Sequence, residues 1–165
     1  MKQVKLGVFV ALAMALSWAE RLLPVSGVVP GGKLGLANIV AVIVLIKYGT
    51  ASAYAVVTVR CVLGALLFGG PMSLPYSLAG GIVSLTVMYI ALKIKTVGVT
   101  GATILGACAH NLAQVTVSCI IMKNIYIFSY FWPLGILSVA AGSFTGICSV
   151  ICLDILKNLK QEEPK

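Results

Sequence analysis

Residues 101–122 read GATILGACAHNLAQVTVSCIIM, an apolar run in which the polar side chains larger than Ser or Thr are His110, Asn111 and Gln114. At helical spacing His110 and Gln114 lie one turn apart and Asn111 lies beside them, so all three point to one side of a helix. Inside a membrane each unsatisfied polar group costs several kcal/mol, so these side chains must face protein, water or a ligand. Two interpretations stay open: hydrogen bonds that join helices, or one wall of a binding pocket.

The composition of the whole chain places that run in a membrane. Of 165 residues, 60% are hydrophobic and 10% are charged, whereas soluble domains are about 25% charged. A soluble domain of this size could not bury so much apolar surface, so we expect an all-α integral membrane protein with a single membrane domain over residues 1–165. The net charge of +8 comes from Lys and Arg at the ends of apolar runs, which indicates membrane topology and lipid headgroups rather than a nucleic-acid partner.

On either side of residues 101–122, Gly, Pro and Lys residues separate the apolar runs and predict a bundle of six transmembrane helices. We expect these helices at residues 6–23, 36–47, 50–68, 74–92, 98–122 and 129–153, followed by a charged tail over 154–165. The first run resembles a signal peptide, and we interpret it as an uncleaved helix that completes an even set. Gly142 and Gly146, four residues apart in the last run, predict the close approach of another helix.

The distribution of Lys and Arg over alternate loops predicts the orientation of the bundle. If the N-terminus is inside, three basic residues of the loops lie outside, namely Arg21, Lys33 and Lys123. The basic residues then placed inside are Lys2, Lys5, Lys47, Lys93, Lys95, Lys157, Lys160 and Lys165. We therefore expect both termini in the cytoplasm, and the Gly- and Pro-rich loop before the second helix on the outer face.

Arg60 lies near the middle of the third predicted helix, where a guanidinium costs about 2.5–3.5 kcal/mol on insertion scales. The acidic residues of the chain are Glu20, Asp154, Glu162 and Glu163, and all except Glu20 belong to the tail. Arg60 is thus expected to pair with Glu20, with carbonyl groups at a helix end or with an anionic ligand. The alternative is that it snorkels, or holds the bundle together through backbone carbonyls.

A second candidate for anion binding is the segment GGKLGLAN at residues 31–38. It is not a phosphate-binding P-loop, because it lacks the required spacing of glycines before Lys-Ser or Lys-Thr. Glycines at the start of a helix nevertheless expose backbone N–H groups and the positive end of the helix dipole, which suits a polar or anionic ligand. Lys33 and, one turn further in, Asn38 are therefore candidate ligand contacts, with an ordinary flexible loop as the alternative.

Several kinds of chemistry lack the residues that they need in this sequence. No membrane run contains a pair of acids to hold Mg²⁺, His110 is the single histidine, and no Walker motif for ATP is present. The cysteines, Cys61, Cys108, Cys119, Cys148 and Cys152, form no C-x-x-C pair, so they predict neither a zinc site nor a disulfide framework. We expect no catalytic activity, no metal and no cofactor, and another subunit must supply the energy for any active transport.

Four ordered motifs resemble the Gx transporter family, which is also labelled heptaprenyl diphosphate synthase component I. They are PGGKLGLANI (30–39), RCVLG (60–64), YSLAGG (76–81) and LGACAHNLAQ (105–114). The family is similar in turn to the substrate-binding S components of energy-coupling factor (ECF) transporters. This resemblance implies a six-helix subunit that captures a vitamin-like ligand from outside and associates with a transmembrane coupling subunit and two ATPases. It also implies that the stripe of Ala11, Ala15 and Ala19 contacts the coupling subunit.

Together with the polar residues of the membrane runs, the resemblance implies the substrate-capturing subunit of an ATP-driven importer in the plasma membrane of a bacterium. We expect its ligand to be a small polar or anionic molecule of vitamin or cofactor type. The predicted ligand contacts are Lys33, Asn38, Arg60, Tyr76, His110, Asn111 and Gln114, with Tyr76 entering from the third motif. The alternative is a non-catalytic accessory subunit of polyprenyl diphosphate or quinone synthesis, since the aspartate-rich motifs of a synthase are absent. A third hypothesis is a passive channel, but the positive charge of Arg60 near the middle of the membrane disfavours the passage of cations.

Overall fold

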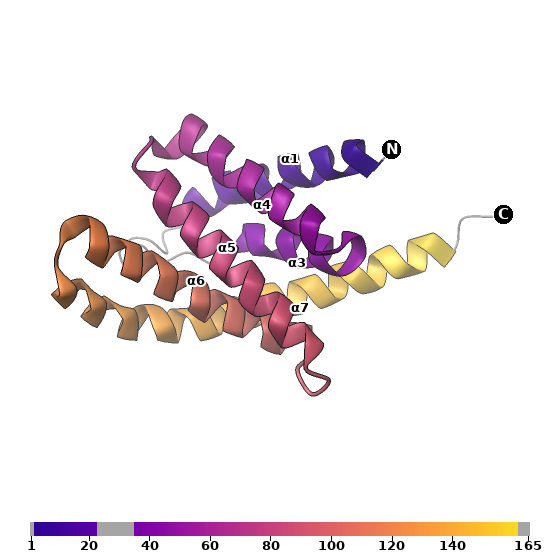
Figure 1. The fold of residues 1–165 in the computed structure, drawn as a ribbon. Coiled ribbons are helices and arrows are strands. Elements are labelled where there is room, and N and C mark those ends of the chain that lie inside the picture. The colour runs from indigo at the N-terminus through magenta and orange to yellow at the C-terminus, as the bar shows by residue number, and fades with distance from the viewer. Residues whose placement is uncertain (1, 23–34, 162–165) are drawn as a thin grey trace.

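Helices account for the secondary structure of residues 2–22 and 35–161, which are the residues described by the computed structural model of this protein (Figure 1). The α-helices are α1 (Lys2–Arg21), α3 (Leu36–Tyr48), α4 (Thr50–Gly64), α5 (Ser73–Lys93), α6 (Val99–Met122) and α7 (Phe131–Gln161). A π-helix, η1 (Ala65–Gly69), extends α4, and a 3-10 helix, η2 (Ile125–Tyr130), precedes α7. These residues contain no strand, which confirms the predicted all-α class.

Among the described residues, five helical segments are long and apolar enough to cross a membrane: α1, α4 with η1, α5, α6, and η2 with α7. The chain is therefore a multi-pass membrane protein. α3 is shorter, because its 13 residues extend over about 20 Å, whereas the hydrocarbon core of a membrane is about 30 Å thick. The middle of α3 is apolar on all sides and is buried from Val40 to Leu45, so this part of the helix packs inside the bundle.

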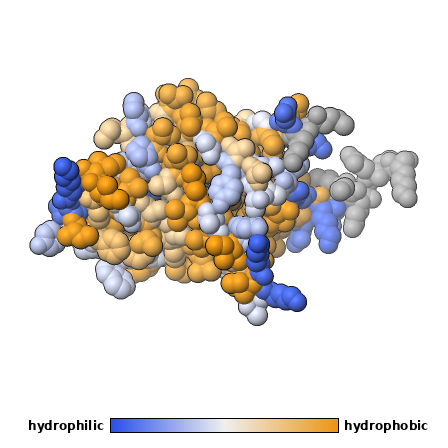
Figure 2. All heavy atoms as spheres, viewed as in Figure 1, coloured by the Kyte–Doolittle hydropathy of each residue, from blue (hydrophilic) through white to orange (hydrophobic). Residues whose placement is uncertain are grey.

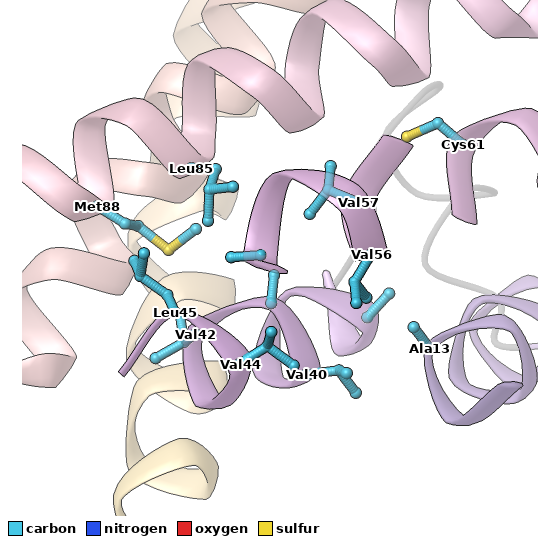
Figure 3. Close-up of a cluster of buried hydrophobic side chains, with 13 residues drawn as sticks. Ala13, Val40, Val42, Val44, Leu45, Val56, Val57, Cys61, Leu85 and Met88 are labelled. Carbon is cyan, nitrogen blue, oxygen red and sulfur yellow. The ribbon is translucent and has the colours of Figure 1, made fainter. Parts of the chain in front are cut away.

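The buried core of the bundle forms around α3, as Figure 3 shows. Its side chains come from α3 (Val40, Val42, Val44, Leu45), α4 (Val56, Val57, Cys61), α5 (Leu85, Met88) and α1 (Ala13). Most of these side chains are small or β-branched, which lets the helices approach each other closely. Lipid tails are as apolar as the core, so close packing rather than the hydrophobic effect has to hold such helices together.

Two glycines allow α7 to pack directly on the backbone of α6. A Cβ atom added to Gly142 would lie 2.5 Å from Cα of Ile104, and one added to Gly146 would lie 2.7 Å from Cα of Thr100. Neither distance leaves room for a methyl group. The predicted close-packing role of this glycine pair is confirmed, and the helix brought close is α6.

Successive helices run in alternating directions, so α1 begins and α7 ends at the same end of the bundle (Figure 1). The opposite end carries η1 and η2, and we call it the η end. Figure 2 shows apolar residues over most of the visible face and hydrophilic residues near its margins. Exposed side chains of α7 such as Ile136, Ile147 and Ile151 suit contact with lipid chains.

The predicted helix ends differ from the structure by one residue for α3, α5 and α6 and by more for α1, α4 and α7. α1 begins at Lys2 rather than residue 6, and it ends at Arg21 rather than residue 23. The predicted helix 50–68 is α-helical to Gly64 and then continues as the π-helix η1. Hydropathy does not reveal such a change of hydrogen-bond register, because the same apolar side chains suit both kinds of helix.

The last helix differs most from its predicted range, 129–153. α7 begins at Phe131, follows directly on η2 and continues to Gln161. The predicted tail is therefore helical through Gln161, because residues 154–161 contain neither Gly nor Pro to end the helix. Pro133 lies in the first turn of α7, where a missing N–H is tolerated.

Candidate binding cavity

A cavity of about 60 Å³ lies between the helices toward the η end. Each of the six α-helices contributes at least one residue to its lining, and Gly35, which directly precedes α3, lines it as well. The described residues that line it are Glu20, Gly35, Asn38, Arg60, Ser77, Ala107, His110, Asn111, Gln114, Ser138, Ala141 and Thr145. A space of this volume holds a few water-sized groups.

One wall of the cavity comes from α6, where His110, Asn111 and Gln114 all line it. This confirms the prediction that the three side chains share one side of a helix. The buried Asn111 also joins two helices, because its Nδ2 donates to Ser138 Oγ at 2.7 Å and to the carbonyl of Leu134 at 3.4 Å. Asn111 therefore both bridges α6 to α7 and lines the cavity.

The imidazole of His110 lies against α5 at Gly80. A Cβ atom added to Gly80 would come within 2.9 Å of Cε1 and Nε2 of the ring. Gly80 is buried and leaves the space that the imidazole occupies, so any larger residue at this position would displace the ring.

Arg60 brings a half-buried guanidinium to the cavity. Its Nη1 donates to Ser17 Oγ at 3.5 Å, and its Nη2 lies 3.8 Å from Cys61 Sγ; a well-formed N–H···O bond is about 2.7–3.2 Å long. Its buried Nε has no hydrogen-bond partner in the part of the chain that the structure describes. Within that part, Arg60 forms neither the ion pair with Glu20 nor the bonds to helix-end carbonyls that the sequence suggested.

Glu20 lines the same cavity but forms its hydrogen bond elsewhere. Its Oε1 accepts from the backbone N–H of Gly35. Gly35 has a φ of 73°, in the left-handed region that favours glycine, and its carbonyl accepts from the N–H of Asn38 at 2.8 Å. Glu20 thus fixes the start of α3 against the end of α1, which sets Asn38 beside the cavity.

The lining also includes three hydroxyl groups that the sequence did not predict, those of Ser77, Ser138 and Thr145. Each also donates to a carbonyl three or four residues earlier in its own helix. Single Ser and Thr residues that satisfy themselves in this way do not stand out within an apolar run. A usable signal is the spacing of Ser138, Ala141 and Thr145, which places three small residues on one face of α7.

Of the two remaining predicted contacts, one is not among the lining residues and the other lies outside the described residues. Tyr76 is on α5 but is not among the lining residues, whereas its neighbour Ser77 is. Lys33 lies outside the described residues. The ligand roles of both stay predictions.

The predicted partner contact lies on the outer surface of the bundle. Ala11 and Ala15 are exposed on α1, and Ala19 is half-buried. Ala13 instead faces the core. The alanine stripe therefore points away from the core, and its contact with a coupling subunit stays a prediction.

The lining is rich in groups that bind polar molecules. It combines a guanidinium, a carboxylate and an imidazole with side-chain amides and hydroxyls, and the apolar side chains among its described residues are those of two alanines. Residues 2–22 and 35–161 contain no cluster of three or more His, Cys, Asp or Glu that could hold a metal ion. Charges and hydrogen-bonding groups that converge on one space can hold a small polar molecule in a defined orientation.

Similarity to known proteins extends over most of the chain. A family model described as heptaprenyl diphosphate synthase component I matches residues 9–151, and every residue that lines the cavity falls within that range. No curated protein and no solved structure matches the chain.

Proposed function

We propose that this chain, which belongs to the heptaprenyl diphosphate synthase component I family, also called the Gx transporter family, is the ligand-capturing membrane subunit of an ATP-driven importer of the ECF type. Its ligand is a small polar or anionic molecule of vitamin or cofactor type. One observation carries the proposal: six helices gather polar side chains around a cavity that contains the poorly bonded guanidinium of Arg60. An ionisable group inside a membrane bundle commonly marks a substrate or ion pathway.

The position of the cavity supports capture from outside the cell. It lies toward the η end, and Lys47 and Lys93 end their helices at the opposite end. An excess of Lys marks the cytoplasmic side of a membrane protein, so the η end faces outward. We propose six membrane spans, with the enclosed α3 as one of them, and both termini in the cytoplasm of a bacterial cell.

Other subunits complete the proposed importer. The sequence has no Walker motif, so separate ATPases supply the energy, and a transmembrane coupling subunit transmits it. The exposed Ala11 and Ala15 of α1 offer a surface on which a partner helix can approach closely. In this arrangement the chain itself has no catalytic role and needs no cofactor.

The test of this function is the replacement of Arg60. Arg60→Ala is expected to leave the protein inserted and folded but to weaken ligand binding about tenfold or more, because it removes charge-assisted hydrogen bonds. Binding is measured as the amount of small molecule that purified protein retains, by mass spectrometry after denaturation. Arg21→Ala is the matched control, since Arg21 bonds the carbonyl of Phe68 and does not line the cavity. Equal retention by wild type and Arg60→Ala would contradict the proposal.

The family's description favours a second candidate, a non-catalytic accessory subunit of polyprenyl diphosphate or quinone synthesis. With Glu20 as the one acid outside the tail, the chain offers no aspartate-rich motif for diphosphate and Mg²⁺. Proteins that co-purify with the tagged chain separate the two candidates. A coupling subunit and ATPases support the importer, whereas a soluble prenyl diphosphate synthase supports the accessory role.

A further inference from the structure

Two side chains of opposite charge line the cavity without bonding to each other. Glu20 Oε1 is used by the N–H of Gly35, and the other carboxylate oxygen forms no hydrogen bond with the described residues. Arg60 makes its two long contacts to Ser17 and Cys61. Within the described part of the chain both groups therefore have unused capacity for a partner, and a charge held in a membrane bundle is costly unless a partner compensates it.

The rest of the lining limits the shape of that partner. Side-chain amides of Asn38 and Gln114 and the hydroxyl of Thr145 face a space of about 60 Å³, and the apolar side chains that the described residues add to it are Ala107 and Ala141. Among the described residues, this lining contains no aromatic or large aliphatic side chain, the kinds that normally cover the apolar body of a ligand. The cavity is therefore complementary to a compact molecule with many hydrogen-bonding groups, and not to an isoprenoid chain or a large ring system.

We propose that the ligand is a compact zwitterion, such as an amino-carboxylate, whose anionic group pairs with Arg60 and whose cationic nitrogen pairs with Glu20. This inference rests on the proposed function and narrows its ligand class. A carboxylate matches the planar fork of a guanidinium, and a cationic nitrogen suits the second oxygen of Glu20. A ligand with negative charge alone would be repelled by Glu20, so the carboxylate selects against simple anions.

The direction in which Glu20→Gln changes the affinity for the ligand tests the inference. Glu20→Gln keeps an Oε1 that accepts from Gly35, so the start of α3 is preserved while the negative charge is lost. For a zwitterion, Glu20→Gln and Arg60→Gln each lower affinity about tenfold or more. For a simple anion, Arg60→Gln lowers affinity while Glu20→Gln leaves it unchanged or raises it. The probe is the compound released from denatured wild-type protein, titrated into ligand-free wild type and variants.

The chemistry of the released compound gives a second readout that does not depend on any variant folding. A compound with both an acidic group and a cationic nitrogen supports the proposal. A compound without the nitrogen, or a Glu20→Gln variant that binds as tightly as wild type, overturns the zwitterion while the importer function stands. If purified wild-type protein retains no more small molecule than Arg60→Gln does, the proposed function itself is overturned.

Discussion

Arg60 and Asn111 show how two polar residues of one bundle come to have different roles. Asn111 donates to Ser138 and Leu134 across the interface of α6 and α7, so its amide is satisfied by protein. Arg60 carries five N–H donors, and its contacts within the described chain are long. Both residues are polar groups in apolar helices, and the hydrogen bonds that their neighbours supply distinguish a helix bridge from a candidate ligand contact.

At the residue scale, the helix bridge can be tested with Asn111→Ala. The substitution is expected to lower the free energy of unfolding by about 1 kcal/mol, the usual size of a hydrogen bond between membrane helices, because Ser138 loses its donor. Reversible unfolding of the purified protein in detergent micelles measures the change. Thr116→Ala is the control, since the exposed Thr116 bonds the carbonyl of Leu112 in its own helix. An equal loss of unfolding free energy in Thr116→Ala and Asn111→Ala would refute the bridge.

At the scale of elements, the end of α1 holds two neighbouring segments in place. Arg21 Nη1 donates to the carbonyl of Phe68 at 2.9 Å, and its guanidinium lies 5.6 Å from the centre of the Phe68 ring. A π-helix leaves the regular i to i+4 pattern of hydrogen bonds, and Arg21 supplies a donor to η1. The preceding residue, Glu20, bonds Gly35 at the start of α3. Two consecutive residues thus tie α1 to η1 and to α3 beside the cavity.

The pairing of α6 with α7 leads to a prediction that compares two glycines of one helix. Gly142→Ala is expected to destabilise the protein by about 1–3 kcal/mol, because the new Cβ would meet the backbone of Ile104, which cannot move aside as a side chain can. Gly135→Ala meets nothing within 4 Å and is expected to be neutral or to stabilise by up to about 1 kcal/mol through helix propensity. Thermal unfolding of both variants in detergent measures the difference. Equal midpoints would argue against the close contact.

At the scale of the whole molecule, the alternating helices place several exposed lysines at the end of the bundle opposite the candidate site. Exposed lysines, among them Lys5, Lys47 and Lys157, lie at the end of the bundle where α1 begins and α7 ends. The cavity lies toward the η end. The aromatic residues Tyr126 and Trp132, which are 83% and 77% exposed near that end, suit the interface between lipid and water. This arrangement fits a protein that receives its ligand at the η end.

The orientation itself is open to a labelling experiment in intact cells. Cysteine introduced as Tyr126→Cys in η2 is expected to react with a membrane-impermeant maleimide, because the proposed orientation places the η end outside the cell. Lys95→Cys, between α5 and α6 at the opposite end, is expected to react after the cells are permeabilised and not before. The unmodified chain with its own cysteines, all buried or half-buried, gives the background. The reverse pattern of labelling would invert the proposed topology.

Much of the fold and part of the candidate site can be predicted from local sequence. A long apolar run predicts a membrane helix, and the 3.6-residue period places His110, Asn111 and Gln114 on one side of it, because both properties depend on consecutive residues. Helix ends are less predictable. The change from α4 to η1 after Gly64 and the extension of α7 to Gln161 occur where hydropathy and the absence of helix breakers leave several boundaries equally acceptable.

The sequence by itself determined that this chain is a helical membrane protein with costly polar residues that require partners. The tertiary structure alone decided that Glu20, Asn38 and Arg60 meet the α6 wall in one cavity, since these residues come from different helices. It also decided that Ser77 rather than Tyr76 lines that cavity. Adjacent helical residues point about 100° apart, and the rotation of an apolar helix about its axis is set by packing against its neighbours, which no local pattern specifies.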